Sequence, residues 1–136
     1  MKLLKCIILL MLTLASLAGT AQTPLSVEAF DQKLAGAPQG QLLDVRTPAE
    51  YVQGHLPRSS NFDFRDPVFV QKIATLDKDK PVFVYCLSGG RSGQAAKLLA
   101  QNGFKEVYDM QGGTLNGQRP VCLPRKTRVP RKFRQE

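Results

Sequence analysis

Apolar residues along the chain follow two spacings, one typical of helices and one typical of buried strands. Helical spacing predicts helices that begin near Val27, Pro48 and Asp66, and a fourth that carries Ala95 and Leu99. Short apolar runs predict strands over 41–45, 81–85 and 105–109, with a further extended segment over 55–62. Because helices and strands alternate, we expect an α/β fold: right-handed βαβ units and a mainly parallel sheet covered by helices on both faces.

Capping residues mark the ends of several predicted helices. Ser26 is placed to cap the first of them. The run Thr47-Pro48-Ala49-Glu50 is a capping box with proline at the first helical position. Gly103 is placed to end the fourth helix in a left-handed conformation.

Residues 1–21 have the pattern of a secretory signal peptide. Lys2 and Lys5 precede an apolar run over 6–18, and residues 19–21 are the small residues of a cleavage site. The run is shorter than the roughly 20 residues that span a bilayer. We therefore expect an exported protein, periplasmic or secreted, whose mature chain starts near Gln22. An uncleaved membrane anchor is the alternative, and only then is membrane contact through this segment expected.

Positive charge is concentrated at the carboxyl end of the chain. The formal net charge is +8, yet residues 22–118 carry ten basic and ten acidic side chains. Residues 119–136 hold seven basic residues, one acidic residue and three prolines. This composition predicts a domain over 22–118 and a flexible basic tail over 119–136. We expect no specific nucleic-acid partner for the tail, although contact with nucleic acid or an anionic membrane is the alternative.

One cysteine lies where parallel sheets place their ligands. Cys86 follows the predicted strand 81–85 and precedes a helix, with Gly89 and Gly90 between. A loop folded around the sulfur directs backbone N–H groups inward, and the helix adds its positive end, so the site favours a thiolate and a bound anion. Arg91 adds a fixed positive charge. A buried structural cysteine is the alternative, which the glycine pair and the arginine disfavour.

Four segments, in order and suitably spaced, resemble the motifs of the single-domain rhodanese-like sulfurtransferases. They are Leu42 to Tyr51, Gly54 to Pro57, Cys86 to Ser92, and Tyr108 to Gly113. The third reads Cys-x-x-Gly-x-Arg followed by serine, as in the family's active loop. The sequence departs from the family after Gly113, where an aromatic helix commonly follows and this chain, which has no tryptophan, continues into its basic tail.

The resemblance implies a thiosulfate sulfurtransferase in which Cys86 is the nucleophile and carries a persulfide. It implies that the loop binds a small anionic sulfur donor through Leu87, Ser88, Gly89, Gly90, Arg91 and Ser92. Asp44 and Arg46 are expected to support the loop, or else to form an ion pair without a catalytic part. His55 is expected to pack in a structural turn. The acceptor is cyanide or a thiol, no metal or organic cofactor is expected, and the domain is expected to be a monomer.

The loop also resembles that of other members of the family. The family's phosphatases and arsenate enzymes have five residues between cysteine and arginine, whereas this loop has four, and the smaller ring favours the smaller sulfur atom. Two alternatives to an enzymatic function stay open. The protein could carry a persulfide to a partner without turnover, or it could be a binding or sensing module, a class that usually lacks the cysteine.

Export would change the cysteine count. Cys6 would leave with the signal peptide, so the mature chain would keep Cys86 and Cys122. A permanent structural disulfide between them is one interpretation. A protective disulfide, formed when Cys122 captures an oxidised Cys86, is another. Paired cysteine or histidine spacing of the kind that binds structural zinc does not occur in the sequence.

Overall fold

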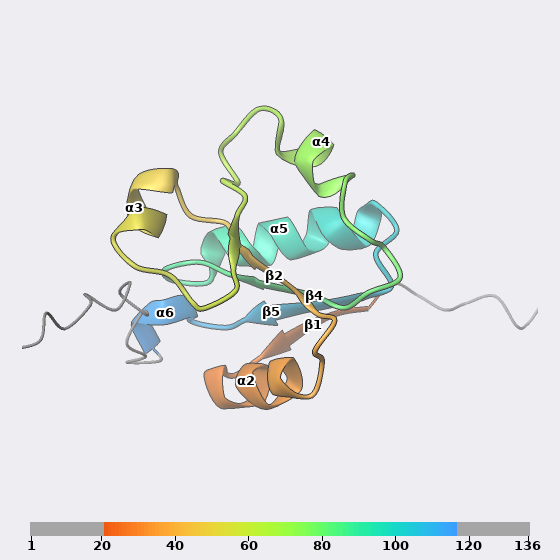
Figure 1. Cartoon of the computed structure of the whole chain (residues 1–136), viewed down its shortest axis with the longest axis horizontal. Coiled ribbons are helices and arrows are strands. Elements are labelled where there is room, and N and C mark those ends of the chain that lie inside the picture. Colours follow the sequence, from red (N-terminus) through yellow and green to blue (C-terminus); the bar gives the residue numbers. More distant parts are fainter. Residues whose placement is uncertain (1–20, 117–136) are drawn as a thin grey trace, which may run out of the picture.

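A computed structural model describes residues 21–116, and these form a five-stranded sheet with helices on both of its faces (Figure 1). The strand order is β1-β5-β4-β2-β3, and every neighbouring pair is parallel. The strands are β1 (Ala21–Leu25), β2 (Gln41–Asp44), β3 (Ser60–Asn61), β4 (Val82–Tyr85) and β5 (Glu106–Met110). The helices are α2 (Val27–Ala35), α3 (Pro48–Val52), α4 (Phe69–Ile73), α5 (Gly90–Gln101) and α6 (Gly113–Asn116). The predicted α/β fold is confirmed.

Two apolar clusters hold the helices against the sheet. On one face, Phe69 of α4 and Leu99 of α5 lie in one buried cluster with Val84 of β4. On the other face, Phe30 of α2 packs on Phe83 of β4, with ring centroids 5.4 Å apart. Because β4 is buried on both faces, all four of its residues are apolar or aromatic.

The predicted caps of α2 and α3 are present. Ser26 Oγ accepts a hydrogen bond from the Ala29 amide at 3.3 Å. In α3, Thr47 Oγ1 accepts from the Glu50 amide at 3.3 Å, while the Glu50 carboxylate accepts from the Thr47 amide at 3.0 Å. Gly103 has a φ of 87°, the predicted left-handed conformation. These bonds satisfy helix-end groups that would otherwise lack partners.

One predicted helix boundary was wrong, and one strand was not predicted. Helix α4 begins at Phe69 and not at Asp66, because Asp66 forms a turn in which its carboxylate accepts from the Val68 amide at 3.0 Å. Strand β1 was not predicted, yet it pairs with β5 along its whole length, from Ala21 opposite Glu106 to Leu25 opposite Met110. It is an edge strand, a position in which Pro24 is tolerated.

Several predictions concern residues outside the described range. They concern the signal peptide, the basic tail, Cys6 and Cys122. The last residue of the predicted signal peptide, Ala21, is described, and it begins β1. Within residues 21–116, no helix is long and apolar enough to cross a membrane.

Candidate active site

Cys86 lies at the carboxyl end of the central strand β4, as predicted. Its loop is short, because α5 begins at Gly90. Gly89 immediately before α5 has a φ of 90°, a left-handed conformation that glycine adopts without strain. The short loop therefore curls back toward the cysteine before the helix begins.

The curled loop directs hydrogen-bond donors at the sulfur. Cys86 Sγ accepts from the Gly89 amide at 3.0 Å and from the Ser92 amide at 3.5 Å. The Ser92 hydroxyl lies 3.6 Å from the same sulfur. Such donors stabilise a negatively charged sulfur more than a neutral one. The predicted inward direction of loop amides is confirmed for these two residues.

Cys86 is a free cysteine and has no exposed surface. Leu87 and Ser88 of the loop are exposed, as is Gly90 at the start of α5. A ligand from solvent therefore reaches Sγ only when an atom that covers it moves aside.

The turn after β5 contacts the backbone of the cysteine loop. The Thr114 amide donates to the Cys86 carbonyl at 3.0 Å. Gly113 has a φ of 59°, and a Cβ at this position would clash with the Cys86 carbonyl oxygen and the Leu87 backbone. Glycine at position 113 is therefore needed for the close approach of the two backbones.

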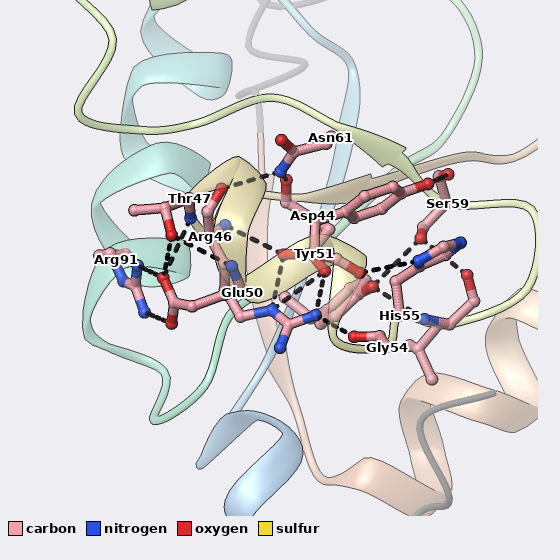
Figure 2. A network of polar contacts seen from close by, with 12 residues as sticks. Asp44, Arg46, Thr47, Glu50, Tyr51, Gly54, His55, Ser59, Asn61 and Arg91 are labelled. Atoms are coloured by element: carbon pink, nitrogen blue, oxygen red, sulfur yellow. Dashed lines mark hydrogen bonds and ion pairs between the residues drawn. The ribbon is translucent and has the colours of Figure 1, made fainter. Parts of the chain in front are cut away.

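Arg91 of α5 faces Glu50 of α3 (Figure 2). Its guanidinium donates two hydrogen bonds of 2.8 Å to the two carboxylate oxygens. Hydrogen bonding from Arg91 lowers the pKa of Glu50 to about 2, and the same bonds raise the pKa of Arg91. Glu50 was expected only to cap α3, so its second contact was missed. That Arg91 also binds a donor stays a prediction.

Asp44 and Arg46 form a buried pair that holds the connection between α3 and β3 (Figure 2). Arg46 Nε donates to Asp44 Oδ1 at 2.9 Å, and its Nη2 donates to the Gly54 carbonyl at 2.7 Å. The Asn61 amide group donates to the Arg46 carbonyl at 2.8 Å. The pair thus holds both ends of the segment over 46–54, which contains Glu50.

His55 occupies a packing position, as expected. Its ring stacks on Tyr51 with centroids 3.8 Å apart, and Nδ1 lies 3.0 Å from the Tyr51 carbonyl oxygen. Within residues 21–116, no three histidine, cysteine, aspartate or glutamate side chains lie close enough together to hold a metal ion.

The chain is similar in sequence and structure to proteins of one family. Residues 26–119 match the family described as Rhodanese-like domain. A sulfurtransferase of Allochromatium vinosum is 34% identical over 100 residues, covering 71% of this chain and 92% of that protein. Thiosulfate sulfurtransferase GlpE of Pseudomonas paraeruginosa is 38% identical over 73 residues, which cover 54% of this chain and 64% of GlpE. The crystal structure of a rhodanese-related protein from Thermoplasma volcanium matches with a TM-score of 0.63 at 27% identity, over 74% of this chain and 98% of that one.

Proposed function

The chain belongs to the rhodanese-like domain family, and on that premise we propose that it transfers a sulfane sulfur from thiosulfate, or a similar anionic donor, to a thiol or cyanide through a persulfide on Cys86. The observation that carries the proposal is the pair of loop amides that donate to Cys86 Sγ. The sulfurtransferases among its relatives support the same reaction class.

In the first step, the Cys86 thiolate attacks the outer sulfur of thiosulfate. A Cys86–sulfur bond forms, and the donor's sulfur–sulfur bond breaks. Its electron pair leaves with sulfite, and the new terminal sulfur carries the negative charge. The amides of Gly89 and Ser92 stabilise charge on the sulfur atoms throughout, because they are fixed by the start of α5 and need no reorganisation.

In the second step, an acceptor removes the outer sulfur. Cyanide or a thiolate attacks it, the bond to Cys86 breaks, and Cys86 leaves as a thiolate. The products are thiocyanate or an acceptor persulfide. Because the nucleophile is regenerated in its ionised form, neither step requires a general base, in agreement with the packing role of His55.

Arg91 is proposed to bind the sulfonate group of the donor. A guanidinium has five N–H donors, and Glu50 engages two of them. Donors therefore remain for a sulfonate oxygen while the ion pair fixes the position of the group. Glu50 thereby becomes a positioning residue for donor binding.

Thiocyanate formation from thiosulfate and cyanide tests the proposal. The full chain should turn over many times, and the Cys86→Ser variant should show no more than the uncatalysed rate. Turnover by Cys86→Ser at the rate of the parent protein would contradict the proposal. A protein that takes up one sulfur but does not turn over with cyanide or a thiol would be a persulfide carrier instead.

A further inference from the structure

The positive charge of Arg91 is offset by an acid of the protein itself. The two terminal nitrogens of its guanidinium each donate a hydrogen bond of 2.8 Å to one carboxylate oxygen of Glu50 (Figure 2). The two side chains are 19% and 28% exposed, so water and salt screen their charges only in part. A guanidinium paired in this way keeps N–H groups for a further acceptor, while the pair as a whole is neutral. It therefore offers hydrogen bonds to a donor and little net attraction for negative charge.

Neighbouring charges make the surroundings of this pair more negative. Arg46 also interacts electrostatically with Glu50, but its own charge is paired with Asp44. The pKa of Arg91 is raised first by its hydrogen bonds to Glu50, and further by other negative charges that include Asp63. Asp63 therefore lies within electrostatic range of the guanidinium. These five side chains together carry one negative charge, and the cysteine thiolate adds another.

Sulfur donors of the proposed kind differ in charge. Thiosulfate carries two negative charges, whereas a thiosulfonate, in which a carbon group replaces one oxygen, carries one. Both react with the thiolate in the same way: a bond forms between Sγ and the outer sulfur, and the donor's sulfur–sulfur bond breaks. The electron pair of that bond leaves with sulfite in one case and with a sulfinate in the other. Both also keep oxygen atoms that accept hydrogen bonds, so charge is a property on which the site can select.

We propose that Glu50 is a specificity-determining residue, whose carboxylate makes the site favour a singly charged sulfur donor over a doubly charged one. The proposal rests on the proposed sulfur transfer through Cys86. A donor oxygen bound to Arg91 lies roughly 5–8 Å from the Glu50 carboxylate, because both contact one guanidinium at hydrogen-bond distance. At this separation the carboxylate repels a donor with two charges about twice as strongly as a donor with one.

The relative use of two donors by the full chain tests the proposal. The value of kcat/KM is measured for thiosulfate and for methanethiosulfonate, with cyanide as the acceptor of both. Glu50→Gln removes the charge and keeps an oxygen for the cap of α3, so it should raise the thiosulfate-to-methanethiosulfonate ratio by about three- to tenfold. A change in the position of Arg91 or in the fold would alter both values together. The ratio therefore reports the charge of Glu50 and not its structural role.

Asp63→Asn is a second test of charge that leaves the ion pair intact. Asparagine keeps the oxygen that accepts from the Arg65 amide at 2.9 Å. This variant should shift the ratio in the same direction as Glu50→Gln, but by less. Glu106→Gln is the matched control, because Glu106 begins β5 at the edge of the sheet opposite to Cys86. It should leave the ratio unchanged.

The outcomes separate this inference from the proposed function. An unchanged ratio in a Glu50→Gln protein that melts as a folded domain would overturn the inference, and so would an equal shift in Glu106→Gln. If Glu50→Gln did not fold, an unchanged ratio in Asp63→Asn would overturn it. In each of these cases the parent protein still turns over both donors. A parent protein that turns over neither donor would contradict the proposed function, and the inference with it.

Discussion

Glu50 and Arg91 lie 41 residues apart in the chain, yet their side chains form two hydrogen bonds of 2.8 Å. Glu50 also completes the capping box of α3 through the Thr47 amide. One carboxylate thus fixes the first turn of α3 and holds the arginine of the cysteine loop.

Glu50→Gln should destabilise the fold by about 1 kcal/mol at pH 7. Glutamine keeps the capping contacts but removes the charge. The pKa of Glu50 is lowered to about 2 in the folded state. The carboxylate therefore stabilises the fold fully when the pH is above the pKa that Glu50 has in the unfolded chain. This stabilisation is lost as the pH falls from about 4 to 2. Urea unfolding at pH 7 and pH 3 should therefore show a smaller difference between variant and parent at pH 3.

Asp66→Asn is the matched control for Glu50→Gln. Asp66 pairs with Lys72 in solvent, so its replacement should change stability little. An equal effect of Glu50→Gln at both pH values would show that the ion pair with Arg91 does not stabilise the fold.

Arg91→Ala should weaken the use of thiosulfate by about ten- to hundredfold, because a charge-assisted contact to the donor is lost. The rate at subsaturating thiosulfate measures this effect. Lys97→Ala removes an exposed positive charge from the same helix and should leave the rate unchanged. Equal rates for Arg91→Ala and the parent would exclude Arg91 from donor binding.

Gly113→Ala should destabilise the fold by about 2–4 kcal/mol and reduce sulfur transfer. The new Cβ would meet the Cys86 carbonyl oxygen, and the φ of 59° disfavours any residue but glycine. Gly90→Ala is the control, since a Cβ there meets nothing within 4 Å and lies in a helix. Thermal melting of both variants checks the contrast. If Gly113→Ala melted at the same temperature as the parent protein, the close approach of the two backbones would be disproved.

Export is predicted from the first 21 residues of the chain. Expressed in a Gram-negative bacterium, the protein should appear in the periplasmic fraction with a mature N-terminus near Gln22. N-terminal sequencing of the fractionated protein checks both points. Replacing Lys2 and Lys5 by glutamate should retain it in the cytoplasm. A full-length protein found only in the cytoplasm would refute the prediction.

The sequence predicted the centre of the fold better than its edges. The run over 81–85 is apolar throughout and ends in a glycine-bearing loop, so β4, Cys86 and the start of α5 could be placed together. Strand β1 gives a weak signal, because Ala21–Leu25 contains a proline and two polar residues. Its place is determined by pairing with β5, a contact remote in sequence.

The positions of two acidic side chains, Glu50 and Asp109, could not be predicted for the same reason. Glu50 already had a local explanation in its capping box, and nothing in its neighbourhood indicates Arg91. Asp109 lies in a strand covered on both faces, so alternation does not show which face its side chain occupies.

The most direct measurement is the mass of the Cys86 peptide after a single sulfur transfer. Treatment of the full chain with thiosulfate should add about 32 Da to this peptide, the mass of one sulfur atom in the proposed persulfide on the nucleophile. Cyanide should then remove it. The account predicts near-complete gain and loss at Cys86, with no gain in Cys86→Ser. An unmodified Cys86 peptide from protein that still forms thiocyanate would contradict it.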